Sequence, residues 1–197
     1  MKDIEFEGSE LLSDSTMQQI ENMTRSMKDQ KFAVDPYCVE IFNSLNYECE
    51  VSVFNDLNDA TGKPLPCKAR LDYVDSLAND GNGLIVDLKS IGEWSPGRSI
   101  NILKWYRQMA FYKDIAVSVG LVTEDCKAGW IFCEKSQPYE AHFHEAEDCL
   151  IEVGRAEYRF LLNQIRLAAE TGHWPGHGKI TYPPSLEKKL EDIQLLL

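Results

Sequence analysis

Three charged side chains have the types and the spacing needed to hold a divalent cation. Asp72 ends the apolar segment 67–72, and an Asp-x-Lys triplet, Asp87-Leu88-Lys89, ends the next apolar run. Alternation along a strand sends Asp87 and Lys89 to the same face. Mg²⁺ prefers a few carboxylates, a carbonyl and waters. The pattern therefore predicts a site for Mg²⁺ and a phosphate where two strands end.

The residues around this triplet complete the predicted site. The side chain of Leu88 is expected to point into the core, while its backbone carbonyl faces the metal. Lys89 is expected beside the nucleophilic water, where it lowers the pKa of that water or stabilises charge in the transition state. A following helix carries Gln108 and Tyr112 one turn apart on one face. Together these residues favour hydrolysis of a phosphodiester bond.

An Asp-x-Lys triplet alone is most often a surface ion pair. Here it ends the most apolar strand of the chain, at 84–88, which reads as buried on both faces. Burying charge without a partner is costly, so a charged pair at this position is unusual. The combination with a second acid and with the Gln–Tyr helix favours the functional interpretation.

The periodicity of the chain predicts the elements that position these residues. Helices are expected from Ser13 or Ser15 to 30 and at 35–45, 99–113 and 145–170, with a short one after 184. Strands are expected at 48–54, 67–74, 84–88, 115–123, 129–134 and 139–144, with a polar loop at 55–66 and a turn at 79–83. The expected fold is α/β, with a restriction-endonuclease-like core in which helices flank a mixed central sheet.

A length of 197 residues and a mass of 22.5 kDa fit one domain. We expect a single nuclease domain over 1–197. Residues 1–12 are expected to be loosely ordered, 13–45 to form N-terminal helices, 46–144 the catalytic core, and 145–197 a C-terminal helix and tail.

Composition and charge restrict the class of protein. No apolar run is long enough to span a bilayer and the acidic N-terminus is not a signal peptide, so we expect a cytoplasmic protein, in the host cytoplasm if a phage encodes it. Six scattered cysteines predict free thiols. The net charge of −12 opposes binding to nucleic acid, but residues 67–135 hold nine basic and nine acidic residues.

Asp72, the Asp87-Leu88-Lys89 triplet and Gln108-Met-Ala-Phe-Tyr112 together resemble the PD-(D/E)xK nuclease superfamily, in its RecB-like branch with a Gln-x-x-x-Tyr motif. The chain is more closely similar to the RecE type of phage and prophage exonuclease (exonuclease VIII), and more distantly to lambda exonuclease. The matching segments, in order, are 50–54, 67–72, 85–90, 106–112 and 174–176.

This resemblance implies a Mg²⁺-dependent exonuclease, with Mn²⁺ as a substitute, that degrades linear double-stranded DNA from 5′ to 3′ during phage-type recombination. It implies a single-strand annealing protein as a partner and a ring-shaped homo-oligomer. By position, Asp72 and Asp87 are metal ligands and Lys89 is the catalytic lysine. Gln108 and Tyr112 support the site and touch the DNA. Glu50, or alternatively Glu48, takes the place of an additional acidic ligand.

Two departures from the family pattern keep an alternative open. Leu71 stands where a Pro usually precedes the first acid, and no His precedes His142, although many RecB-like enzymes place a His on an upstream helix. A catalytically degenerate module of the same fold that binds DNA or a protein is the alternative, and an acidic mimic of DNA is a third hypothesis. Trp94 and Trp105 flank the site, where they could stack on DNA ends or pack in the core.

Overall fold

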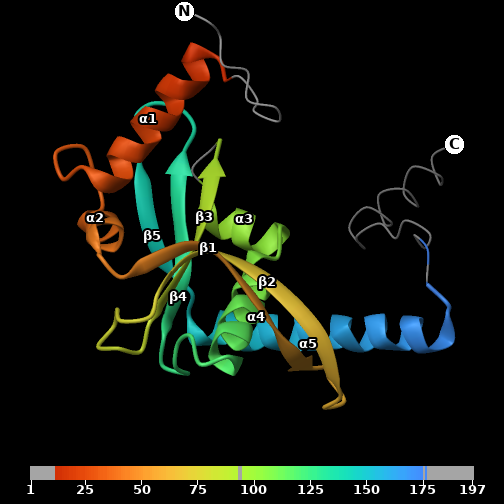
Figure 1. Cartoon of the computed structure of the whole chain (residues 1–197). Coiled ribbons are helices and arrows are strands. Elements are labelled where there is room, and N and C mark those ends of the chain that lie inside the picture. Colours follow the sequence, from red (N-terminus) through yellow and green to blue (C-terminus); the bar gives the residue numbers. More distant parts are fainter. Residues whose placement is uncertain (1–11, 93–94, 175, 177–197) are drawn as a thin grey trace, which may run out of the picture. The chain divides into compact units, whose positions relative to one another are not determined.

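Five strands form one mixed sheet in a computed structural model of the chain, which describes residues 12–92, 95–174 and 176 (Figure 1). The strands are β1 (Tyr47–Asn58), β2 (Pro64–Asp75), β3 (Leu84–Ile91), β4 (Lys127–Glu134) and β5 (Ala141–Glu145), and they lie side by side in this order. Neighbouring strands are antiparallel except β3 and β4, which are parallel. The α/β class with a mixed central sheet is therefore confirmed.

By its internal contacts the chain divides into two compact units, Met1–Asn163 and Gln164–Leu197. The first unit holds the whole sheet and every residue of the expected site. The expectation of one domain over the full chain stays a prediction. The expected helix after 184 lies outside the described residues.

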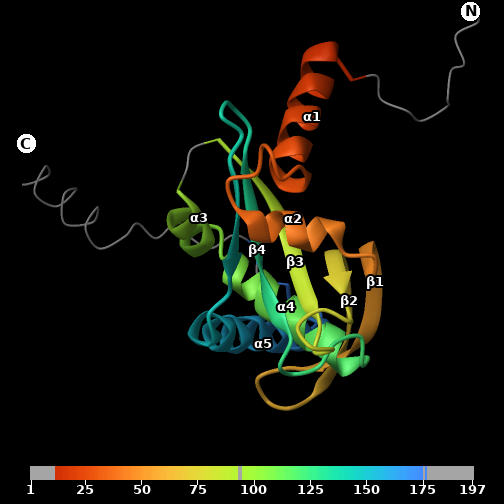
Figure 2. The same ribbon diagram turned by 90° about the vertical axis from the view of Figure 1, so that its left-hand side faces the viewer.

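Two N-terminal helices cover one face of the sheet (Figure 2). Helix α1 (Asp14–Lys28) begins at Ser13, whose hydroxyl accepts from the Thr16 N–H, and α2 (Pro36–Asn43) begins at Asp35 with Pro at its first position. Both starts confirm the helix signals in the sequence. Apolar residues of these helices form a cluster with those of four strands, β2 to β5; its buried members include Cys38, Ile41, Tyr73, Val86 and Ile131.

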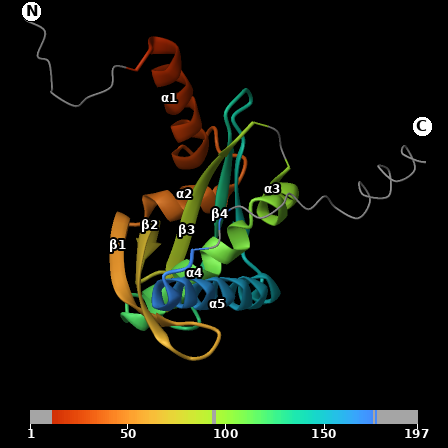
Figure 3. The same cartoon turned by 90° about the vertical axis from the view of Figure 1, so that its right-hand side faces the viewer.

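Two further helices pack on the opposite face of the sheet (Figure 3). These are α4 (Trp105–Ser118) and, within the first unit, the part of α5 (Asp148–Thr171) up to Asn163. Gly154 of α5 allows the close approach to α4, because a Cβ there would lie 2.5 Å from the Tyr106 carbonyl oxygen. The larger core cluster includes Met109 of α4 and Ile85 of β3. Helix α4 is thereby fixed against the strand that carries the Asp-x-Lys triplet.

The structure corrects two expectations on either side of α4. The helix expected at 99–113 is two helices, α3 (Pro96–Ile102) and α4, because Lys104 between them adopts a left-handed conformation with φ 57°. The strand expected at 115–123 is wrong, since α4 continues to Ser118 and no strand follows before β4. Ile115 and Ala116 are both fully buried against the core, so packing overrode the β-branched composition there.

The polar loop expected at 55–66 is also wrong. It is the end of a long hairpin, in which β1 runs to Asn58 and β2 begins at Pro64. Asp59 closes the turn: its Oδ1 accepts from the Thr61 N–H at 2.7 Å and from the Lys63 N–H at 3.0 Å. A side chain that satisfies the turn lets a polar sequence pair as strands.

At Asp72 the β1–β2 hairpin changes which of its two faces is buried. Tyr73 packs with the α1–α2 side, whereas Leu71 packs with the α4 side, although the pairing register is unchanged on both sides of this point. Glu50, opposite Asp72 on β1, has φ 58°. This left-handed residue allows the two strands to twist sharply, so that Asp72 turns towards β3.

Candidate active site

The pairing of β2 with β3 ends at the residues directly adjacent to the two acids, Asp72 and Asp87. Tyr73 and Val86 are the last paired residues; beyond them, β2 remains paired only with β1, and β3 only with β4. The two strands separate here, and this fork leaves a backbone N–H of β3 without a strand partner. The Leu88 N–H instead donates to Asp72 Oδ2 at 3.0 Å. Asp72 and Asp87 therefore lie at the two sides of the fork.

Asp87 is one of the most deeply buried charged groups of the described residues, at 1% exposure. Its Oδ1 accepts from Gln108 Nε2 at 3.3 Å, and its Oδ2 lies 2.7 Å from Lys89 Nζ. This ion pair is the contact that Oδ2 makes, and no backbone N–H donates to it. Burial raises the pKa of Asp87 to about 6; Lys89 opposes this shift and the neighbouring Asp72 adds to it.

Lys89 is held from three sides. Besides the carboxylate of Asp87, its ammonium donates to Gln108 Oε1 at 3.2 Å and lies 5.3 Å from the centre of the Trp105 ring. The same-face placement of Asp87 and Lys89 follows the expected alternation. The contact of Trp105 with Lys89 was not predicted, although Trp105 lies three residues before Gln108 and hence on the same helix face.

Gln108 connects the groups of the site through both ends of its amide. Its Oε1 accepts from Lys89, and its Nε2 donates to Asp87 and to the Tyr112 hydroxyl oxygen at 2.8 Å. An ammonium can only donate, which fixes the orientation of this amide. Burial raises the pKa of Tyr112; the Gln108 donor opposes the shift and nearby carboxylates add to it. The structure thus brings Asp72, Asp87, Lys89, Gln108 and Tyr112 together.

The additional acid is placed less favourably. Glu50 has an exposed side chain that contacts Arg70 Nε, and Glu48, the alternative, is exposed on β1 opposite Val74. The carboxylate of Glu50 does raise the pKa of Tyr112, so it lies at the margin of the site. Neither glutamate forms a third member of an acid cluster with Asp72 and Asp87, since the described residues contain no group of three possible ligands.

The expectation for the Leu88 side chain is wrong. Instead of entering the core, it is 38% exposed and lines a pocket with Met23 and Met27 of α1. The Leu88 N–H points to the fork, and in an extended strand the carbonyl of the same residue points to the same side. The expected direction of that carbonyl agrees with this backbone geometry.

The residues present fit a hard divalent cation. Mg²⁺ keeps several waters and binds proteins through one or two carboxylates, often together with substrate phosphates. Asp87 Oδ2 is a buried carboxylate oxygen to which no backbone N–H donates, and it lies beside a second carboxylate. Four-ligand zinc chemistry has no comparable set of side chains among the described residues; His142 of β5 contacts Glu140 only two residues away. Trp94 lies outside the described residues.

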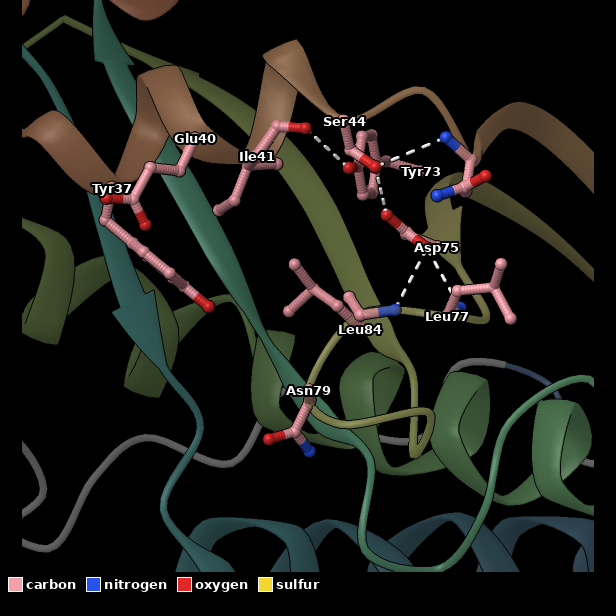
Figure 4. A pocket seen from close by; sticks show the side chains of 11 residues that line it. Tyr37, Glu40, Ile41, Ser44, Tyr73, Asp75, Leu77, Asn79 and Leu84 are labelled. Carbon is pink, nitrogen blue, oxygen red and sulfur yellow. Dashed lines mark hydrogen bonds between the residues drawn. The ribbon is translucent and has the colours of Figure 1, made fainter.

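A second buried aspartate shows what a purely structural role looks like. Asp75, at the other end of the β2–β3 pairing, is 2% exposed and lines a separate cavity of about 300 Å³ beside α2 (Figure 4). Its Oδ1 accepts from the N–H groups of Leu77 and Ala78, and its Oδ2 accepts from the Ser44 hydroxyl. Asp75 is fully hydrogen-bonded by a turn and a helix end, whereas Asp87 is not.

Comparison with known proteins places the chain among nuclease-like folds. The model of a family described as a PDDEXK-like domain of unknown function (DUF3799) matches residues 2–184. A crystal structure of a provisionally assigned exonuclease from Eubacterium rectale superposes with a TM-score of 0.56 at 15% identity, covering 87% of this chain and 64% of that one. This chain therefore spans less than two thirds of that protein. The structure of SSO0001 aligns at a TM-score of 0.41 and 13% identity over 79% of each chain, too weakly to bear on the fold. No curated protein sequence matches.

Proposed function

Because the chain belongs to the family of PDDEXK-like domains, we propose that it is a nuclease that hydrolyses phosphodiester bonds of DNA at the fork between β2 and β3. The observation that carries this proposal is the buried Asp87 carboxylate, which is paired with the Lys89 ammonium beside Asp72 and whose Oδ2 accepts from no backbone N–H. Burial raises the pKa of this carboxylate even beside Lys89, and a bound divalent cation would favour its charged form.

In this proposal Asp72, Asp87 and the Leu88 carbonyl hold Mg²⁺, with Glu50 as an additional ligand through water. The bound ion would neutralise charge on the phosphoryl oxygens and make its water more acidic. Lys89 places a positive charge beside the attacking water, and it can stabilise charge that develops on the phosphate. Gln108 fixes the direction of the Lys89 ammonium, and Tyr112 fixes Gln108, since each is linked to the next by a hydrogen bond.

The substrate, the direction of degradation and the partners of this nuclease are further parts of the proposal. We propose that the substrate is linear double-stranded DNA, that degradation runs from 5′ to 3′, and that it serves phage-type recombination. A single-strand annealing protein as a partner and a ring of identical subunits belong to the same proposal. They are supported by the likeness of the motifs in 50–112 to RecE-type exonucleases.

Digestion of end-labelled linear duplex, with a closed circular duplex as a control, tests this function. We expect Mg²⁺-dependent release of 5′-terminal nucleotides from linear DNA only, and its loss in Asp72→Asn. Asp80→Asn is the matched control: it makes the same chemical change at an exposed turn residue whose φ of 57° suits Asn, so activity should be kept. Intact linear DNA with wild-type protein would reject the nuclease and favour a binding module of the same fold.

A further inference from the structure

The outer side of the β1–β2 hairpin carries cations and an aromatic ring next to the proposed site. In the register of this hairpin Ser52 pairs with Arg70 and Phe54 pairs with Lys68, so the four side chains are neighbours on one face. All four are exposed, whereas residues between them, such as Val53 and Ala69, are buried in the core on the α4 side. We call these four residues the hairpin face.

We propose that the hairpin face binds the DNA strand that leads to the fork, with Arg70 and Lys68 on successive phosphates and Phe54 against an unpaired base. This inference rests on the proposed function, because it names where that substrate lies. Nothing in the fold requires these side chains: none of the four is part of a buried cluster, and their exposure makes them available to a ligand.

The hairpin face lies next to Asp72 along the strand. Arg70 lies two residues and Lys68 four residues before Asp72 on the same strand, which corresponds to about 7 Å and about 13 Å at a rise of about 3.3 Å per residue. Arg70 Nε contacts the carboxylate of Glu50, and this carboxylate in turn acts on Tyr112 of the site. A DNA strand that runs from Asp72 along the outer side of β2 would meet Arg70 first and Lys68 next.

The present partners of the two cations are readily exchanged. The side chains of Arg70 and Glu50 are 64% and 56% exposed, and an ion pair exposed to this extent is worth at most about 1 kcal/mol. A phosphate can replace Glu50 with two hydrogen bonds from the guanidinium. Lys68 lies 5.3 Å from the centre of the Phe54 ring, and that ring is 65% exposed.

The chemistry of the face favours a nucleic acid strand as its occupant. Cations that follow a strand, combined with an aromatic ring on which a base can stack, are the usual means of holding single strands. Asp56 follows Phe54 on the outer part of β1, so the positive charge is confined to the two positions next to the fork. In a chain of net charge −12 these cations stand where phosphates of the proposed substrate would run.

Binding measured by fluorescence anisotropy tests the inference without any catalysis. The probe is a fluorescein-labelled duplex with a single-stranded extension, titrated in EDTA over a salt series. In Lys68→Gln/Arg70→Gln we expect about tenfold weaker binding and a salt slope lower by about 2, one for each lost phosphate contact. Phe54→Leu keeps an apolar side chain but removes the ring, so it should weaken binding to the extended duplex and leave a blunt duplex unaffected.

Lys31→Gln/Lys135→Gln is the matched control, because it removes the same two charges at exposed positions away from the hairpin. An unchanged slope in the Lys68 and Arg70 variant, or an equal fall in the control, would overturn the inference. Cleavage by the wild-type protein in Mg²⁺ is measured in parallel. If the wild-type protein cleaves DNA but the salt slope of the Lys68→Gln/Arg70→Gln variant is unchanged, only the role of the hairpin face is rejected. If the wild-type protein neither cleaves nor binds DNA, the proposed function is rejected.

Discussion

Replacing Asp87 with Asn should stabilise the metal-free protein, although it removes a member of the proposed site. The carboxylate is 1% exposed, and its Oδ2 is paired with the Lys89 ammonium but accepts from no backbone N–H. An amide keeps the shape of the side chain and removes the buried charge. A group placed for a cation should cost stability when the cation is absent.

The magnitude follows from the pKa of Asp87, which burial raises from 3.8 to about 6. Each pKa unit corresponds to about 1.4 kcal/mol, so ionisation in the fold costs at most about 3 kcal/mol, and about 2 kcal/mol after relaxation of the site. A pKa raised in the folded state means that the fold binds the proton more tightly than the unfolded chain. The protonated carboxyl of Asp87 therefore contributes its full share of the free energy of unfolding below about pH 4. This contribution is lost as the pH rises through about 6.

Thermal melts in EDTA measure this effect. At pH 7.5 we expect Asp87→Asn to melt about 4–8 °C above the wild type, and at pH 4 the difference should disappear. Added Mg²⁺ should raise the melting temperature of the wild type and leave that of the variant nearly unchanged, because the ligand is lost.

Asp75→Asn provides a control with the opposite sign. Asp75 is equally buried, but two backbone N–H groups and the Ser44 hydroxyl satisfy its carboxylate. The same substitution should therefore destabilise the protein by about 1 kcal/mol at pH 7.5. If Asp87→Asn is less stable than the wild type, or if its higher melting temperature persists at pH 4, the reasoning is refuted. The carboxylate would then not be a group that costs stability until a cation binds.

Three further substitutions test the site and the packing that positions it. Lys89→Gln should lower Mg²⁺-dependent cleavage by about 10²–10⁴-fold while the protein still binds DNA in EDTA, as gel-shift assays can show. Gln108→Leu breaks the links to Lys89, Asp87 and Tyr112, so kcat should fall at least about tenfold with a smaller change in KM. Gly154→Ala should destabilise the fold by about 1–3 kcal/mol in urea, because the new Cβ would lie 2.5 Å from a backbone oxygen of α4, whereas helical Gly97→Ala, with open space around it, should be neutral or slightly stabilising.

Local chemistry in the sequence was enough to predict most of the elements. Ser13 or Ser15 and Asp35-Pro36 predicted two helix starts, and the apolar run at 84–88 predicted a buried strand, which is buried at 84–87. These signals depend on groups a few residues apart, so no tertiary information is needed to interpret them. The errors lie where long-range contacts decide: at 115–118, which packing made helical, and at 55–66, where Asp59 closed a turn.

The sequence also determined which residue types could form the site, since Asp87 and Lys89 share a strand face by alternation and Gln108 and Tyr112 share a helix face. Apart from the family motif, which selects Asp72, no local physical property of the sequence separated Asp72 from Asp75, an acid three residues later on the same strand. Only the tertiary structure separates them, because the β2–β3 pairing ends beside Asp72 and a turn satisfies Asp75. Where strands part depends on the twist of the whole sheet, and that twist is not a local property of any segment.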